Sequence, residues 1–516
     1  MGYRANGIGV GRRLEKPRTP RWWHVASALA VVGALVLGVL AWRALAARWQ
    51  EGRFRARGVV YGPPPPAMGQ GVDPWGVNVA LEQYSDQALS RSLDLLTEAG
   101  FRWVRQRFSW AEIEPSRGDR QWQRWDRIVD ECQRRGLRLI AVLDGSPQWA
   151  RAPADSANPH APPRNPADLA AFARAFAARY GTAIDHYQIW DEPNIYPHWG
   201  ERDPDPAGYL SLLRAARTQI RDVDPGALIV AAGLAPTTEE RGRNLSDLLF
   251  LRGLYQAGGR ELFDVVAAKP YGFWSDADDR RVEAGVLNFS RLVAVREEMV
   301  RQGDGDKSLW AVAWGWNALP ADWHGQPSPW GSDVPARQHE RDLAAIERAR
   351  QEWPWLRLMC YAAWQPAAAA DDPVWGLALL DAQGVPGPLY HRLQALARAP
   401  GPLYPGRYTV LAPMPGGPAL ELVFWGSRVD LVGDGRWRLV ELDGRPLGRT
   451  LAGRGTRPVT AVRGLETGEH RLVLEAAGPA APLIVVVSRQ RPPWVEGSLL
   501  VALGVGAVVA GAVLFC

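Results

Sequence analysis

Cysteine is scarce in this 516-residue sequence, which has only Cys132, Cys360 and Cys516. Three cysteines cannot form the disulfide framework of a small secreted domain. The sequence also has no CxxC motif and no cluster of histidine and cysteine, so it lacks the patterns of the usual zinc sites. We therefore expect neither a metal site nor a cofactor.

Lysine is equally scarce and occurs only as Lys16, Lys269 and Lys307. The formal net charge is +5, but residues 1–57 alone hold eleven Lys or Arg and two acidic residues. Residues 58–490 have a small excess of acidic residues. This distribution excludes the basic surface of a DNA- or RNA-binding protein, so we expect no nucleic acid among the partners.

Charge is absent from two runs near the ends of the chain. Residues 22–42 contain no Lys, Arg, Asp or Glu, and neither do residues 497–516, which follow Trp494 closely. About 20 apolar residues in a helix reach roughly 30 Å, the thickness of a hydrocarbon core. The sequence therefore predicts transmembrane helices over 22–42 and 494–516, with the membrane as a partner. A cleaved signal peptide is the alternative for the first run.

The predicted domains follow from shifts in composition. Residues 1–57 form a basic N-terminus that carries the first transmembrane helix. Residues 58–74 form a proline-rich linker, in which the four consecutive prolines 63–66 favour a stiff polyproline II stalk.

Residues 75–400 alternate short apolar runs with amphipathic helical stretches. The runs cover residues 75–80, 102–108, 137–144, 185–191, 227–233, 263–269, 308–314 and 356–364. Strands that alternate with helices predict an α/β fold with a parallel sheet and right-handed crossovers. Eight such units predict a (β/α)8 TIM barrel, and no GxGxxG motif follows a strand to favour a dinucleotide-binding fold.

Residues 401–490 have a different sequence pattern, in which short strand-like runs are separated by turns and no amphipathic helical stretches lie between them. Asp443-Gly444 is a typical hairpin signal. We expect a small β-sandwich or jelly roll here. The predicted fold is thus a TIM barrel followed by this β-domain, with a transmembrane helix on each side.

Polar and aromatic residues gather at the ends of the predicted barrel strands, where TIM barrels have their active sites. Aromatic rings stack on the apolar faces of sugars, while placed polar groups bind the sugar hydroxyls. The sequence therefore predicts a carbohydrate partner. The candidate substrate-binding residues are Arg105, Trp110, Asp144, Trp149, Trp190, Asp191, Asn194, Lys269, Tyr271, Trp314, Trp316 and Trp364.

The stretch YQIWDEPN, Tyr187–Asn194, resembles the strand-4 motif of clan A glycoside hydrolases, especially family 39 and cellulase-like members. Ser109-Trp110, Pro147-Gln148-Trp149-Ala150 and Trp375-Gly376-Leu377 are further matches. The resemblance implies a TIM-barrel O-glycosyl hydrolase. It also implies that Glu192 is the catalytic general acid/base.

Three positions depart from this family pattern. Ala313 stands where the family has its nucleophilic glutamate, Lys269 replaces a histidine, and Asp191 replaces the asparagine before the acid/base. Retaining hydrolysis needs two carboxylates about 5–5.5 Å apart, and an alanine cannot form the glycosyl-enzyme intermediate. A cation beside Glu192 also favours its ionised form, whereas a general acid must carry a proton.

Three functions therefore remain open. The first is a membrane-anchored glycoside hydrolase-like protein that binds carbohydrate with altered catalysis. The second is an inverting hydrolase that uses Asp144, Asp191 or Asp276 as its base. The third is a structural cell-envelope protein that uses the barrel as an interaction scaffold. A glycan ligand would place the barrel and the β-domain outside the cytoplasm, where envelope and secreted glycans lie.

Overall fold

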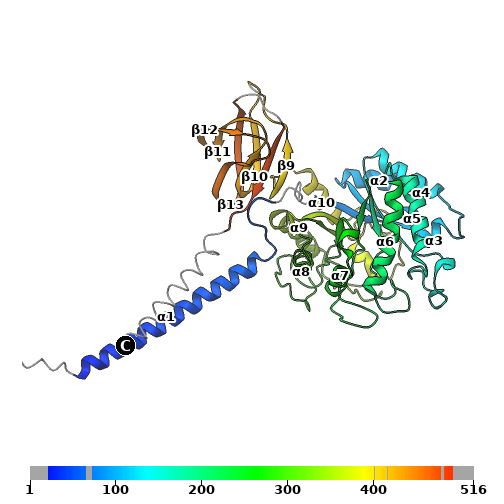
Figure 1. The fold of residues 1–516 in the computed structure, drawn as a ribbon, viewed down its shortest axis with the longest axis horizontal. Coiled ribbons are helices and arrows are strands. Elements are labelled where there is room, and N and C mark those ends of the chain that lie inside the picture. The colour runs from blue at the N-terminus through cyan, green and yellow to red at the C-terminus, as the bar shows by residue number, and fades with distance from the viewer. Residues whose placement is uncertain (1–20, 65–72, 400, 415, 478–481, 492–516) are drawn as a thin grey trace, which may run out of the picture. The chain divides into compact units, whose positions relative to one another are not determined.

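The computed structural model describes residues 21–64, 73–399, 401–414, 416–477 and 482–491. Residues 57–490 form one compact unit, and helix α1 (Arg21–Ala56) belongs to another. The first of these units contains a barrel and a separate antiparallel sheet (Figure 1).

Eight parallel strands close into a barrel in chain order, and β1 pairs with both β2 and β8. The strands are β1 (Asp73–Val79), β2 (Trp103–Ser109), β3 (Arg138–Asp144), β4 (His186–Ile189), β5 (Leu228–Val230), β6 (Val265–Ala268), β7 (Ser308–Trp314) and β8 (Leu356–Tyr361). This closed parallel order confirms the predicted TIM barrel.

Helices connect successive strands and form the outer layer of the barrel (Figure 1). They are α2 (Asp86–Glu98), α3 (Trp110–Ile113), α4 (Gln123–Arg134), α5 (Pro166–Tyr180), α6 (Pro206–Val223), α7 (Asp247–Gln256), α8 (Arg291–Arg301), α9 (Pro335–Glu352) and α10 (Pro388–Arg398). Single 3-10 turns are η2 (Leu81–Gln83), η3 (Gln148–Ala150), η4 (Pro153–Asp155), η5 (Gly259–Leu262) and η6 (Pro373–Leu377).

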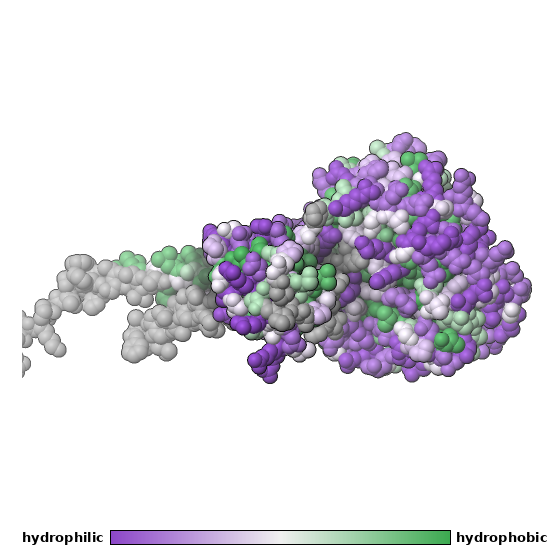
Figure 2. All heavy atoms as spheres, turned by 90° about the horizontal axis from the view of Figure 1, so that it is seen from above, coloured by the Kyte–Doolittle hydropathy of each residue, from purple (hydrophilic) through white to green (hydrophobic). Residues whose placement is uncertain are grey.

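Helix α4 shows why these stretches fold as helices against the barrel. Its buried residues are Trp125, Ile128, Val129 and Cys132, a spacing that puts all four on one face. The opposite faces of such helices carry charge, and Figure 2 shows hydrophilic residues over most of the visible barrel surface.

Three aromatic rings fill the inside of the barrel near the N-terminal ends of its strands. The ring centroids of Trp103 and His186 are 5.0 Å apart, and Trp310 lies 5.8 Å from Trp103. Burial lowers the pKa of His186 to about 4, so its ring stays neutral at physiological pH. Because these three rings occupy the N-terminal end of the barrel interior, a functional site is expected at the opposite end, where the strands have their C-termini.

The β-domain is one six-stranded antiparallel sheet in the order β12-β11-β13-β10-β14-β9. Its strands are β9 (Gly406–Val410), β10 (Leu420–Val432), β11 (Gly435–Leu442), β12 (Arg445–Gly453), β13 (Val459–Ala476) and β14 (Leu483–Ser488). A register shift after Gly426 interrupts the pairing of β10 with β13, and such bulges bend a strand. A small antiparallel β-domain is thus present after the barrel, as one continuous sheet with its own apolar core, where the sequence predicted a β-sandwich or jelly roll.

The predicted transmembrane helix over 22–42 is wrong. Within the described ranges, no helix has both the length and the apolarity needed to cross a membrane. The apolar run is the first part of α1, which has 36 residues in all. The helix continues past the run through Arg43, Arg48 and Glu51 to Ala56. The other predicted transmembrane helix, 494–516, lies outside the described residues.

The first residues of the predicted linker lie against the barrel. Two nitrogens of Arg57 donate to the carboxylate of Glu297 at 2.8 Å, and the indole of Trp355 donates to the Gly58 carbonyl at 3.1 Å. Gly58 has a φ of +81°, and a Cβ there would lie 2.6 Å from Val293 Cγ2. The segment after Ala56 is therefore docked on the barrel, while residues 65–72 lie outside the described part.

Candidate active site

The backbone after β4 turns sharply and places two acidic side chains at the C-terminal end of the barrel. Trp190 and Glu192 have positive φ angles of 69° and 52°, which are uncommon outside glycine. The chain is held there because Glu192 N donates to the Gly233 carbonyl at 3.1 Å, beside a bridge between Asp191 and Gly233. Backbone held in such conformations occurs often at functional sites.

Lys269 follows β6 and lies between these two acidic side chains. Its Nζ is 2.8 Å from Asp191 Oδ2 and 2.7 Å from Glu192 Oε1. The side chain of Lys269 is 6% exposed, compared with 17% for Asp191 and 19% for Glu192. The ammonium group is therefore buried under the two carboxylates, and Glu192 is the member that solvent reaches most readily.

Arg105 of β2 holds Asp191 from inside the barrel. Its Nη2 lies 2.8 Å from Asp191 Oδ1, its Nε donates to Gln188 Oε1 at 2.9 Å and its Nη1 donates to Asn78 Oδ1 at 2.7 Å. Gln188 in turn donates to Asp191 Oδ1 at 3.0 Å. Both oxygens of Asp191 are thus engaged by groups that fix its position and its charge.

The charges of this cluster are stable at neutral pH. Burial raises the pKa of Asp191, but Arg105 and Lys269 outweigh that effect and hold the pKa well below its ordinary range. Burial lowers the pKa of Lys269, but Asp191 and Glu192 outweigh it and raise that pKa above its ordinary value. Tyr271 lies beside the cluster, and burial raises its pKa to about 12. Lysine and aspartate remain ionised, and the phenol remains protonated.

One histidine lies beside the other oxygen of Glu192, and a second histidine packs against the first. His198 Nε2 lies 3.3 Å from Glu192 Oε2, and the ring of His160 lies 4.8 Å from that of His198. Burial, followed by the charges of His198 and Arg107, lowers the pKa of His160. Both histidines stand in irregular loops, where no strand or motif marked them in the sequence.

Ala313 near the end of β7 lies in an apolar cluster. Its buried neighbours there are Tyr271, Phe273, Ala363 and Leu377, and its own exposure is 4%. The position therefore carries no carboxylate that could act as a nucleophile.

The other candidate bases are paired with arginines. Asp144 Oδ1 lies 2.5 Å from Arg107 Nε, and Asp276 Oδ1 lies 2.8 Å from Arg341 Nε. Each of these two carboxylates is thus paired with an arginine, whereas Glu192 is paired with Lys269.

Most of the tryptophans predicted at the site are buried. Trp110, Trp190, Trp314, Trp316 and Trp364 are each less than 2% exposed. Their rings pack in the interior, and four indole nitrogens donate to protein oxygens, as Trp190 does to the His198 carbonyl at 2.9 Å. These rings shape the site from within and present no face to a ligand.

Trp149 and Asn194 also support the surrounding loops. Trp149 is half-buried and donates to the Glu114 carbonyl at 3.1 Å. Asn194 is fully buried and donates to the carbonyls of Ala235 and Leu245. Of the predicted residues, the structure thus brings together Arg105, Asp191, Glu192, Lys269 and Tyr271 as one cluster.

Comparisons with known proteins agree with the barrel fold. The model of the family 42 glycoside hydrolases, described as beta-galactosidase, matches residues 79–153. A family 39 glycoside hydrolase from Bacteroides cellulosilyticus WH2 superposes with a TM-score of 0.51 at 17% identity, over 81% of this chain and 83% of that chain. The barrel has the fold of the clan A glycoside hydrolases. The resemblance found in the sequence is therefore confirmed.

Other structures show weaker likeness. A family 39 beta-xylosidase from Caulobacter crescentus has a TM-score of 0.46 at 13% identity, over 81% of this chain and 98% of that chain. No curated protein matches the sequence. In this glycoside hydrolase-like barrel, Glu192 follows β4 and Ala313 is in β7, the strands that carry the acid/base and the nucleophile in the family pattern.

Trp274 is an exposed aromatic residue of this glycoside hydrolase-like barrel that was not among the predicted site residues. Trp274 follows β6 and is 70% exposed, which is rare for so large an apolar ring. Its ring lies 6.1 Å from that of Phe273, and a Cβ built on Gly331 would be 3.2 Å from Trp274 Cε2. In the sequence, only its position five residues after Lys269 indicates that Trp274 belongs to a loop at the candidate site.

Proposed function

We propose that the barrel binds carbohydrate at the C-terminal ends of its strands and does not perform retaining hydrolysis. The observation that carries this proposal is the position of Lys269 between Asp191 and Glu192, together with an alanine in the apolar cluster of β7.

The ion pair opposes the role of Glu192 as a general acid. A general acid must hold a proton and release it to the leaving oxygen. The ammonium of Lys269 already donates a hydrogen bond to Glu192 at 2.7 Å, and this interaction is strongest when the carboxylate is ionised. Without a carboxylate at position 313, the second requirement of the retaining mechanism is also missing.

The same groups suit the binding of sugar hydroxyls. The partly exposed carboxylate of Glu192 accepts hydrogen bonds, while His198 and the 43% exposed side chain of Arg107 can donate them. Trp274 adds an exposed ring for stacking on a pyranose face. Such a combination of a few polar groups and an aromatic surface is typical of carbohydrate sites.

An inverting hydrolase is the second candidate, favoured by the exposure of Glu192 to solvent. It requires a base about 6.5–9.5 Å from the acid to activate water. The carboxylates of Asp144 and Asp276 are already engaged by the guanidinium groups of Arg107 and Arg341. We therefore rank carbohydrate binding above inverting hydrolysis. As glycans of the envelope and secreted glycans lie outside the cytoplasm, the proposal includes an extracytoplasmic barrel and β-domain.

The test combines a glycan array with hydrolysis assays on aryl glycosides, using the full-length protein. We expect binding to at least one glycan and no release of the aryl group. Retaining hydrolysis with a trapped covalent intermediate would overturn the proposal, as would an array without any bound glycan. If hydrolysis occurs, Glu192→Gln separates the candidates, because an inverting enzyme loses its activity with this change.

A designed gain of function tests the same argument from the opposite direction. Lys269→His with Ala313→Glu restores both groups of the family pattern. We expect the double variant to hydrolyse an aryl glycoside measurably, whereas Ala313→Glu alone remains inactive because Lys269 still pairs with Glu192. Equal activity of the two variants would show that Lys269 does not suppress catalysis.

A further inference from the structure

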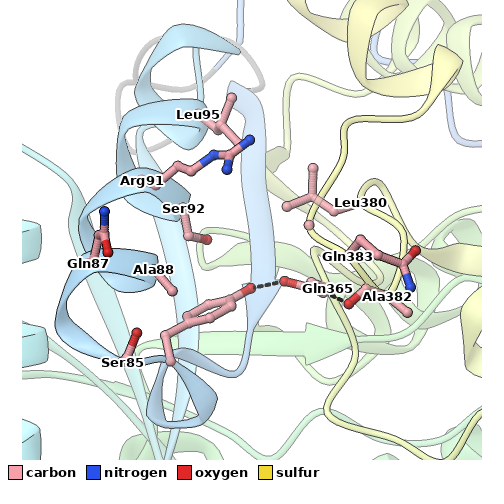
Figure 3. A pocket seen from close by; sticks show the side chains of 12 residues that line it. Ser85, Gln87, Ala88, Arg91, Ser92, Leu95, Gln365, Leu380, Ala382 and Gln383 are labelled. Atoms are coloured by element: carbon pink, nitrogen blue, oxygen red, sulfur yellow. Dashed lines mark hydrogen bonds between the residues drawn. The ribbon is translucent and has the colours of Figure 1, made fainter.

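A separate cleft lies between α2 and the loop that follows β8 (Figure 3). Its volume is about 460 Å³, within the range of about 300–1,000 Å³ that is common for small-molecule sites. Its walls combine polar groups with apolar ones, including Arg91 and Leu95 from α2 and Leu380 and Gln383 from the loop. None of its lining residues belongs to the cluster around Glu192.

The floor of the cleft is held by a network of hydrogen bonds. Tyr84 Oη donates to Gln365 Oε1 at 2.6 Å, and Gln365 Nε2 donates to the carbonyls of Asp381 and Ala382 at 3.0 and 3.2 Å. Gln83 donates to the Gln365 carbonyl at 3.0 Å. Figure 3 shows this floor joining the two sides of the cleft. Because these groups are already fixed, a ligand would not have to order them.

Arg91 is the one charged residue that lines the cleft. It is exposed and makes no ion pair with any described residue, and Figure 3 shows it reaching from α2 toward Leu380. The side chain of Gln383 likewise makes no hydrogen bond within the described ranges. A cation and an amide are therefore free to bind a ligand.

Nearby acids do not neutralise this cation. On α2, Asp86 pairs with Arg127, and Asp94 lies 2.8 Å from Arg135. In the opposite loop, the carboxylate of Asp381 accepts the backbone N–H groups of Gln383 and Val385 at 2.9 Å. The cleft thus keeps a positive charge beside polar and apolar walls.

We propose that this cleft is a second saccharide site, which binds a sugar that carries a carboxylate. Arg91 pairs with the carboxylate, since a guanidinium matches its geometry. Gln383 binds hydroxyl groups through its amide, which both donates and accepts hydrogen bonds. Leu95, which is half-buried in the wall of the cleft, faces the apolar side of the ring. The proposal does not rest on the function of the Glu192 cluster.

The experiment is a calorimetric or NMR titration of the full-length protein with D-glucuronate, D-glucose and acetate. We expect glucuronate to bind more tightly than either control, because glucose lacks the charge and acetate lacks the ring. Its affinity falls about tenfold in Arg91→Gln and by a smaller factor in Arg91→Lys, which keeps the charge but loses the paired geometry of the guanidinium. Added salt weakens binding in the wild type more than in Arg91→Gln.

Control variants locate the binding site. Trp274→Ala, at the other proposed site, leaves glucuronate binding unchanged, because the 70% exposed ring of Trp274 does not line this cleft. The thermal unfolding midpoint of Arg91→Gln stays at the wild-type value because Arg91 is exposed. Glucuronate affinity that survives in Arg91→Gln, or acetate that binds as tightly as glucuronate, overturns the proposal. Loss of binding in Trp274→Ala but not in Arg91→Gln would place the acidic sugar at the other proposed site instead.

Discussion

The ammonium nitrogen of Lys269 lies 2.7 Å from Oε1 of Glu192, a residue 77 positions earlier in the chain. The closing of the barrel brings the ends of β4 and β6 to the same mouth, so two groups that are distant in sequence become an ion pair. This contact links the stability of the barrel to the chemistry of its candidate site.

Removal of the lysine is predicted to destabilise the barrel. Lys269→Met leaves Asp191 with one cation and Glu192 without its amine partner. Breaking a buried ion pair costs about 3–5 kcal/mol in the free energy of unfolding, which urea denaturation measures. Lys307→Met is the matched control with a smaller loss, because its partner Asp304 keeps Arg260 and Tyr255. Equal stability of Lys269→Met and wild type at pH 7 would contradict this argument.

The same ion pair predicts how stability depends on pH. The pKa of Asp191 is lowered in the folded protein, so its contribution is present above its unfolded pKa of about 3.9 and is lost as pH falls further. The pKa of Lys269 is raised, so its contribution is complete below about pH 10.4 and is lost at higher pH. The stability difference between wild type and Lys269→Met should therefore be flat from about pH 5 to 10. A difference that changes strongly near pH 7 would point to other groups.

Replacing Gly233 with a larger residue is predicted to destabilise the protein, because the charge cluster leaves no room for a side chain there. A Cβ there would lie 2.8 Å from Val312 Cγ2, 3.0 Å from Asp191 Oδ1 and 3.1 Å from Lys269 Cε. Gly233→Ala should cost about 2 kcal/mol of stability, since overpacking displaces these groups. Gly226→Ala is the control, because its Cβ would meet only Asp224 Oδ1 at 3.7 Å. The two variants should differ clearly in denaturant unfolding, and equal midpoints would contradict the prediction.

Substitution of Trp274 is predicted to affect glycan binding, whereas substitution of Trp316 is predicted to affect stability. Trp274→Ala should weaken glycan binding about threefold to tenfold without lowering the unfolding midpoint, because the ring is 70% exposed. Trp316→Ala should cost about 3–5 kcal/mol of stability, because the ring is fully buried and a Cβ on Gly272 would lie 1.8 Å from it. Affinity and thermal unfolding measured on both variants check this. Unchanged glycan affinity in Trp274→Ala would show that the ring of Trp274 does not contact the glycan.

The buried carboxyl group of Asp342 on α9 is predicted to lower the free energy of unfolding as pH rises. It is fully buried, and it accepts hydrogen bonds from Trp316 N at 3.2 Å and from Tyr361 Oη at 3.1 Å. Burial raises its pKa well above the ordinary value, so the folded state holds the proton more tightly than the unfolded state does.

Stability therefore falls as pH rises above about 3.9, the pKa of an unfolded aspartate. Asp342→Asn imitates the protonated acid and removes this effect. We expect the variant to match wild type near pH 4 and to become progressively more stable than wild type toward pH 8. Parallel stability curves for the two proteins would contradict the assignment.

The barrel could be predicted from the sequence because its eight strands alternate with helices whose apolar faces repeat at helical spacing. The ends of strands were harder to place. The run 185–191 reads as a continuous strand, but β4 stops at Ile189 because the backbone turns at Trp190 with a φ of 69°. The apolar run 22–42 read as a separate membrane helix, whereas α1 extends through charged residues to Ala56.

The sequence by itself determined the barrel, the β-domain and the departures at Asp191, Lys269 and Ala313, since strand periodicity and residue identity are local properties. Only the tertiary structure decided that Lys269 contacts both acids and that the predicted tryptophans face the interior. It also brought His198 to Glu192 from an irregular loop. The direction of a side chain depends on backbone turns and on the packing of distant elements, and no local pattern records these.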